Sequence, residues 1–333
     1  MNKIFALAAM VGSLICTASF GRAEVRGPYL ADQNTLHLYH FDEPGNVVND
    51  AKTGEAMFDL KLSGGAGLTS GRADFGRALS TRSMKEARAA IAKTVSSQSL
   101  WNTETGAFTY EALVRMDFEP ANLLENRNDR MQILSVDSNG KGSTRSMHLS
   151  LRPVGVAGAT APSLEVIKFA SFKGEAIQNL VAELPSSGPH IPVRDKWFHV
   201  AITYNGDEGI LGNCKIYWTR VDDSATEANL LATATLRSDM AVQQKSIFAV
   251  GNSGRTVEDT KENWLGQIDE VRISSVARAA DEFLFQAAHP LKGNAVNSVS
   301  TEFPVEPGEK VVATKVTTPF ECFVSGEGIA NPQ

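Results

Sequence analysis

The pattern that most limits the fold is the alternation of apolar and polar residues in short segments separated by turn-forming clusters. In Phe108–Met116 every second residue is apolar, and Phe198–Tyr204 repeats the pattern. A period of two places the apolar residues on one face of a strand. Clusters rich in glycine, such as Gly64–Gly67 and Gly251–Gly254, separate these segments. The sequence therefore predicts an all-β fold, an antiparallel two-sheet sandwich, rather than units of strand, helix and strand.

Helix-forming patterns are scarce. One short helix is expected near residues 276–288, where Val276, Phe283 and Leu284 are spaced for one helix face and Pro290 ends the segment. Residues 83–95 are rich in alanine, lysine and arginine, which favours a helix, yet they lie between two strand regions, so both structures stay open. Further strands are expected at residues 36–41, 132–136, 148–151, 164–172, 214–221, 230–236, 247–250 and 264–273.

The first 23 residues have the pattern of a cleaved signal peptide. Lys3 precedes a mostly apolar run up to Phe20, and Gly21 and Ala23 are small residues before Glu24. A transmembrane anchor is the alternative, but the run is at the short limit for a span and contains polar residues. No later stretch is long and apolar enough to cross a membrane. We therefore expect an exported protein, periplasmic or extracellular.

Composition excludes some partners. The chain has 333 residues, 42% of them apolar and 21% charged, with a net charge of −6 and a pI near 5.6. These fractions are typical of a globular protein. Binding to nucleic acid through its phosphates needs a basic surface, which this charge balance does not provide. We expect no nucleic-acid partner.

Two cysteines remain after the predicted signal peptide, Cys214 and Cys322. An oxidising compartment would permit one disulfide between them. The alternative is two free thiols, one of them buried on a strand, and sequence alone does not decide between the two.

Six segments occur in an order that resembles a known superfamily. They are His37–Gly54, Gly71–Ser80, Gly106–Met116, Asp195–Gly206, Cys214–Asp222 and Trp264–Arg278. Their order and spacing are similar to the concanavalin A-like lectin/glucanase superfamily, particularly the LamG-like jelly rolls of exported bacterial proteins. The resemblance implies one jelly-roll sandwich over residues 27–288. Residues 289–333 lie outside it, and their β-type residues suggest a C-terminal β appendage or tail.

The glucanase branch of this superfamily carries the pattern E-x-D-x-x-E on one strand, and this sequence lacks it. Retaining glycosidases need two carboxyls about 5–5.5 Å apart. Glu111 stands alone on its strand, whereas Asp222–Asp223 and Asp269–Glu270 are adjacent and point to opposite faces of a strand. His148 and His199 are expected on strands, where a histidine is more often structural than catalytic. We assign no catalytic residue.

The resemblance also implies a structural calcium where the first and last strands meet, near Asp42, Asp50 and Asp269. Calcium prefers six to eight oxygen ligands, including backbone carbonyls, so a few carboxylates can suffice. The alternative is that Asp42 and Asp50 cap turns and that Asp269 pairs with Arg272 or Arg278.

The function that the sequence favours is an exported, non-catalytic module that binds a glycan or another exported protein. Trp101 and Trp218 are the candidate aromatic contacts for a polysaccharide. One alternative is an enzyme, a lyase or hydrolase that cleaves polysaccharide, which predicts a cleft lined by charged side chains. The other is a structural envelope or adhesion protein, which predicts a flat face without a pocket.

Overall fold

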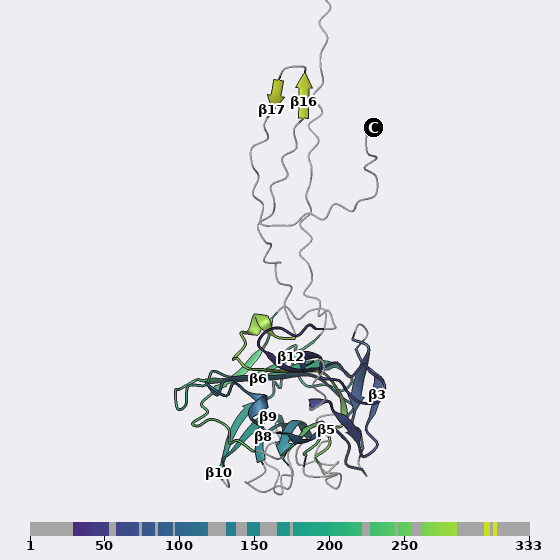
Figure 1. The fold of residues 1–333 in the computed structure, drawn as a ribbon, viewed down its shortest axis with the longest axis vertical. Helices are drawn as coiled ribbons and strands as arrows, with labels where there is room; N and C mark the ends of the chain where they lie inside the picture. Colours follow the sequence, from purple (N-terminus) through teal and green to yellow (C-terminus); the bar gives the residue numbers. More distant parts are fainter. Residues whose placement is uncertain are drawn as a thin grey trace, which may run out of the picture.

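The structure is a computed structural model of the chain. It describes residues 29–52, 58–72, 75–83, 86–95, 97–118, 131–137, 145–153, 165–173, 176–221, 227–243, 246–254, 262–284, 303–306 and 309–311. Two antiparallel sheets pack face to face as a β-sandwich, which confirms the predicted fold class (Figure 1).

The larger sheet has eight strands and contains both the first and the last strand of the sandwich. Its order is β13 (Leu230–Ala234), β12 (Cys214–Arg220), β11 (Trp197–Tyr204), β6 (Phe108–Met116), β15 (Gly266–Ser274), β4 (Arg77–Ser80) and β3 (Gly67–Ser70), with β1 (Thr35–Tyr39) also beside β15. The strand β15 pairs with β4 at Gln267 and Ile268 and with β1 over residues 271–274. One edge of β15 therefore changes partner near residues 269 and 270.

The smaller sheet has seven strands. Its order is β10 (Ala176–Glu183), β9 (Glu165–Lys173), β8 (Arg145–Pro153), β7 (Met131–Asp137), β14 (Ser246–Val250), β5 (Ala89–Val95) and β2 (Lys61–Ser63). The segment whose structure the sequence left open thus contains the strand β5, which pairs with β14 and β2.

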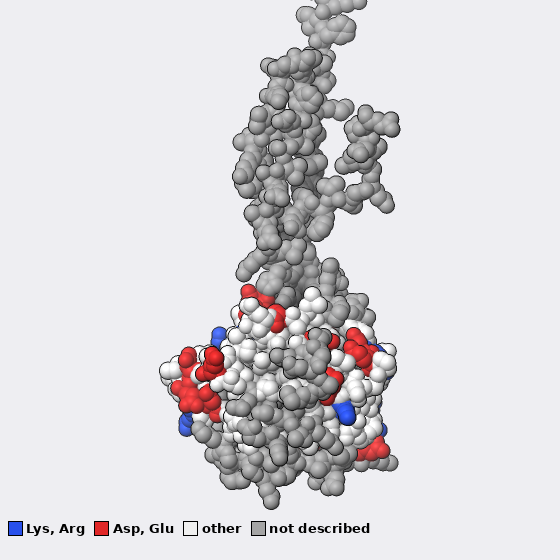
Figure 2. Space-filling model, viewed as in Figure 1, with Lys and Arg blue, Asp and Glu red and all other residues white. Residues whose placement is uncertain are grey.

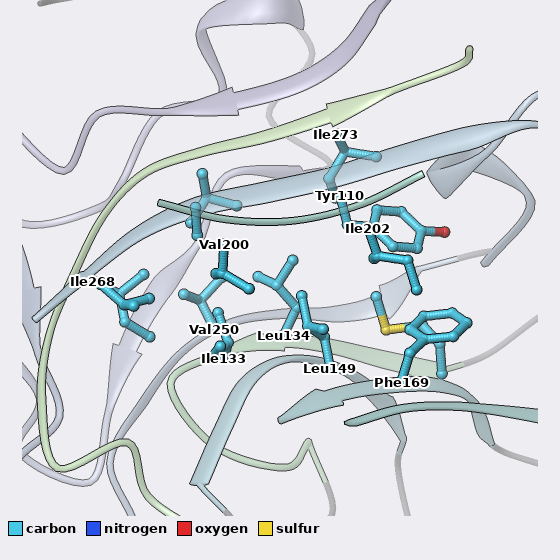
Figure 3. Close-up of a cluster of buried hydrophobic side chains, with 14 of the residues drawn as sticks. Tyr110, Ile133, Leu134, Leu149, Phe169, Val200, Ile202, Val250, Ile268 and Ile273 are labelled. Atoms are coloured by element: carbon cyan, nitrogen blue, oxygen red, sulfur yellow. The ribbon is translucent and has the colours of Figure 1, made fainter. Parts of the chain in front are cut away.

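The core lies between the sheets. Tyr110 and Ile202 of the larger sheet meet Leu134, Leu149 and Phe169 of the smaller one, and all five are buried (Figure 3). Apolar area removed from water contributes about 25 cal/mol per Å². The alternating residues that predicted the strands are therefore the ones that hold the two sheets together.

The helical elements with bounds in the described part of the chain are the 3₁₀ turns η1 (Asp50–Lys52), η3 (Ser97–Leu100) and η6 (Ala280–Glu282). The helix expected at residues 276–288 is therefore wrong in its extent: up to Leu284 only the turn η6 forms, and residues 285–288 lie outside the description. The main chain extends again at Phe283, with φ −72° and ψ 165°. Among the described residues, no helix has the length and apolar character needed to span a membrane.

The segment predicted as a C-terminal appendage is described only in part. β16 (Phe303–Glu306) and β17 (Glu309–Val311) pair as an antiparallel hairpin. The predicted signal peptide at residues 1–23 lies outside the described residues. Figure 2 shows small, separate groups of acidic and basic side chains on the described part of one face, without a continuous basic surface.

Candidate functional site

A polar network occupies the outer face of the smaller sheet at β7 and β8. Gln132, Ser135, Asp137, His148 and Ser150 point away from the core, because β7 shifts register between Gln132 and Leu134, and all five are buried. Described segments contact this face: Ser135 Oγ donates to the backbone oxygen of Asn252 and accepts the backbone N–H of Gly254. The outer face of the smaller sheet therefore carries a row of buried hydrogen-bonding side chains.

His148 links the two ends of this network. Its Nε2 lies 3.2 Å from Asp137 Oδ2, and its Nδ1 lies 3.4 Å from Gln132 Nε2. Because an amide nitrogen only donates, Nδ1 accepts and the proton lies on Nε2, which donates to Asp137. Gln132 Nε2 also donates to Glu262 Oε2 at 3.2 Å, while Gln132 Oε1 is buried without a hydrogen-bond partner. A buried acceptor without a partner costs about 1–3 kcal/mol, so it is a feature to explain.

A second cluster lies where β15 changes partner. The register of β15 against β6 shifts between Asp269 and Arg272, and Glu270 has a φ of 46°. Phe41, just after β1, has a φ of 61°. Residues other than glycine seldom adopt such angles, and they persist where the surrounding structure holds them. The strained backbone brings Asp42, which follows Phe41, toward the same turn as Asp269.

That turn, which begins at Gly71 and ends at Arg77, leaves room for the two carboxylates. A Cβ atom on Gly71 would lie 2.9 Å from Asp269 Oδ2, and one on Gly76 would lie 2.2 Å from Asp42 Oδ1. Asp42 Oδ1 accepts a hydrogen bond from the backbone N–H of Arg77 at 2.7 Å. Asp269 is fully buried and its Oδ2 has no hydrogen-bond partner.

Burial, together with the nearby charges of Glu270 and Asp42, raises the pKa of Asp269 well above its usual value. An ionised carboxylate in this position needs a cation or a proton. The residues thus fit a cation at this turn, with Asp269 and Asp42 as side-chain ligands. In the described residues, however, no group of three or more His, Cys, Asp or Glu side chains is arranged to hold a metal ion. Backbone carbonyls and water would have to complete the shell.

Asp50, the third predicted ligand, takes a different position. Its Oδ2 lies 3.3 Å from Nε2 of His40, whose Nδ1 lies 2.8 Å from Glu270 Oε1. Asp50 is therefore engaged by a histidine rather than placed at the glycine turn. The alternative ion pairs of Asp269 are wrong, because Arg272 pairs with Glu111 and Arg278 pairs with Asp32.

A third cluster lies on the outer face of the larger sheet. Glu111 on β6 accepts hydrogen bonds from Arg272 Nε at 2.7 Å and pairs with His199 Nε2 at 2.9 Å. All three side chains are buried. Burial by itself raises the pKa of Glu111, but the charge of Arg272 and the hydrogen bond from His199 outweigh it and lower the pKa to about 2. The sequence placed Glu111 alone on its strand, since nothing local signals partners from strands distant in the chain.

The predicted aromatic contacts belong to the core. Trp101 is 5% exposed and Trp218 is fully buried. Trp218 stacks on Phe198 with ring centroids 4.5 Å apart, and its indole N–H donates to the backbone oxygen of His190. Neither indole presents a face to a ligand, so the structure corrects their predicted role. Tryptophan on a half-buried strand serves packing equally well, and sequence alone does not separate the two uses.

Cys214 has a free, buried thiol, and Cys322 lies outside the described residues. The predicted disulfide therefore has no support from the structure. Burial raises the pKa of the Cys214 thiol to about 12.

Comparisons with known proteins give only distant similarities. No family model matches the chain, and no curated protein matches it. The binding domain of botulinum neurotoxin serotype C1 superimposes with a TM-score of 0.44 and 12% identity over 74% of this chain and 50% of its own. Trypanosoma rangeli sialidase superimposes with a TM-score of 0.43 and 11% identity over 78% of this chain and 33% of its own. The enzymatically active domain of tailspike protein 2 from bacteriophage CBA120 superimposes with a TM-score of 0.43 and 10% identity over 68% of this chain and 30% of its own. The chain thus spans half or less of the length of each. The LamG-like family assignment stays a prediction.

Proposed function

We propose that the protein is a non-catalytic carbohydrate-binding module, exported from the cell, whose binding face is the outer face of the smaller sheet. The observation that carries the proposal is the network of Asp137, His148 and Gln132. Planar amide, carboxylate and imidazole groups suit sugar hydroxyls, which both donate and accept hydrogen bonds. Gln132 Oε1 is a buried acceptor without a hydrogen-bond partner, so binding requires this side chain and its buried neighbours to become accessible to a sugar hydroxyl.

The larger sheet is a poorer candidate. The segment Ala279–Leu284 covers its charged cluster, where Leu284 N donates to Glu111 Oε2 at 2.8 Å. Apolar side chains on the outer face of the larger sheet contact Tyr29 and Phe283, which belong to the segments before and after the strands of the sandwich. This face is therefore occupied by the chain itself. The network on the smaller sheet is also buried, with Asn252 and Gly254 bonded to Ser135, so glycan binding there requires this cover to open.

A glycan microarray tests the proposal with His148→Ala and, as the control, Lys215→Ala, which changes an exposed residue of the other sheet. We expect the unaltered protein and Lys215→Ala to bind the same glycans and His148→Ala to lose that binding. Circular dichroism verifies that each variant is folded. His148→Gln, which keeps a planar polar group, should retain part of the binding. Signal no higher than that of heat-denatured protein would refute the proposal, and release of new reducing ends from a bound glycan would favour the enzyme alternative.

We also propose that calcium binds at the glycine turn, held by Asp269 and Asp42. The bound ion would neutralise the two carboxylates and fix β1 and β4 beside β15. Thermal melting of the unaltered chain and of Asp269→Asn, each with calcium and with chelator, tests this. We expect calcium to raise the Tm of the unaltered chain only. A Tm that calcium leaves unchanged, with Asp269→Asn more stable than the unaltered chain, would show instead that Asp269 is a buried carboxyl without a cation.

A further inference from the structure

The segment Ala279–Leu284 is attached to the larger sheet in an unusual way. The segment is not a strand of either sheet. Among the described turns and loops, it makes one backbone–backbone hydrogen bond, from Glu282 N to Ala279 O, and this bond lies within the segment. Its attachment to β6 and β15 instead uses side chains of the sheet that bind main-chain atoms of the segment. We call this segment the strap.

Two charged side chains hold the strap on either side of Phe283. Arg272 Nη2 donates to the backbone oxygen of Glu282, and Glu111 Oε2 accepts the backbone N–H of Leu284 at 2.8 Å. Glu111 and Arg272 also pair with each other, with Arg272 Nη2 2.6 Å from Glu111 Oε1. Each of the two charged side chains therefore bonds both to the other and to the main chain of the strap.

An aromatic pocket lies between these two contacts. The ring of Phe283 is fully buried and lies 4.8 Å from the ring of Tyr217, edge to face, and 5.2 Å from that of His199. Ala201 completes the apolar contact. The residue that precedes the strap is held separately, because Arg278 pairs with Asp32 at 2.6 Å.

A buried ion pair often contributes no net stability, because desolvation offsets the attraction between the charges. Here the pair also provides an acceptor and a donor that match the polar groups of an extended main chain. This is the chemistry of peptide recognition, in which main-chain hydrogen bonds hold the backbone and a pocket accepts one side chain.

We propose that Glu111, Arg272, His199 and Tyr217 form a peptide-binding site for a short extended segment with a central phenylalanine, and that the strap occupies this site in cis. The sandwich then folds without the strap, and the strap opens locally. A peptide with the sequence of the strap takes its place when the strap is released. The two main-chain contacts flank the residue that the pocket selects, so both depend on the phenylalanine.

The test compares Phe283→Ala with Phe248→Ala, a matched change of a fully buried phenylalanine in the central core. Hydrogen exchange is followed by mass spectrometry in the full chain. In Phe283→Ala we expect faster exchange at residues 279–284 and unchanged protection in β6 and β11. In Phe248→Ala we expect faster exchange across both sheets. Leu284→Pro, which removes the N–H bound by Glu111 and keeps the phenylalanine, should speed exchange of the strap roughly 10- to 100-fold, as expected for loss of one hydrogen bond to a charged group.

A labelled synthetic peptide with the sequence of residues 278–286 then reports on the empty site. It should bind Phe283→Ala one to one and bind the unaltered chain at least about tenfold more weakly, because there the strap competes; tenfold corresponds to about 1.4 kcal/mol. The same peptide with alanine at position 283 should not bind. Loss of protection throughout β6 and β11 in Phe283→Ala would overturn the proposal, as would a strap peptide that fails to bind that variant.

Discussion

The replacement of Glu111 by glutamine should reduce stability in a way that depends strongly on pH. Glu111 has a pKa of about 2 in the folded protein against an ordinary value of 4.5. A carboxyl whose pKa is lowered by folding stabilises the protein above its unfolded pKa and loses that contribution as the pH falls through the folded pKa. The difference of about 2.5 pKa units corresponds to about 3 kcal/mol at neutral pH, at roughly 1.4 kcal/mol per unit.

Urea denaturation of the unaltered chain and of Glu111→Gln at pH 7, 4.5, 3 and 2 measures this contribution. We expect Glu111→Gln to be less stable by about 3 kcal/mol at pH 7, since Arg272 then lacks its charged partner. The gap should close between pH 4.5 and pH 2, because protonated Glu111 resembles the uncharged amide. Other buried carboxyls titrate in both proteins and cancel in the comparison. A gap of constant size from pH 7 to pH 2 would refute the assigned ionisation of Glu111.

Three further predictions concern the turn, the core and the thiol. Gly76→Ala should lower the free energy of unfolding by more than about 1 kcal/mol, because Gly76 has a φ of 74° and a Cβ would lie 2.2 Å from Asp42 Oδ1; urea denaturation measures this, and an unchanged midpoint would contradict the described turn. Trp218→Ala should lower the free energy of unfolding by about 3–5 kcal/mol, because Trp218 is fully buried. Leu30→Ala, at a residue that is 85% exposed, should change the free energy of unfolding by no more than about 0.5 kcal/mol. Equal effects of the two substitutions would place Trp218 outside the core. Cys214 should stay unmodified by iodoacetamide at pH 8 in the native protein and react after denaturation, as peptide mass spectrometry would show, because its thiol is buried with a raised pKa; fast native labelling would contradict its burial.

The fold was predictable because each strand carries its own periodicity. The apolar residues of Phe108–Met116 share one face, and the structure places that face on the core. Where local signals conflict, the tertiary structure decides. The composition of residues 83–95 favours a helix, yet residues 89–95 form β5 because β14 and β2 provide hydrogen-bonding partners on both sides.

The polar clusters were harder to predict, because they arise from register rather than from spacing. Glu111 and Arg272 are partners across β6 and β15, and Ala201 beside Glu111 brings β11 and its His199 to the same place. No short motif records these pairings. One signal was available: both Glu111 and His199 lie on the strand face opposite the apolar one, and a charged residue in the middle of a long central strand seldom lies there without a partner. The turn of Gly71–Arg77 was visible as a motif, but the glycine positions that face Asp42 and Asp269 were not.

The pairing of β1 with β15 has a consequence for when the protein can fold. Leu38 is the register partner of Arg272, so among the described strands β1 has no pairing partner until almost the whole sandwich has been synthesised. Closing so long a loop is slow, since its entropy is lost before the contact repays it. A ribosome-bound chain shorter than about 274 residues therefore lacks the strand that completes the larger sheet.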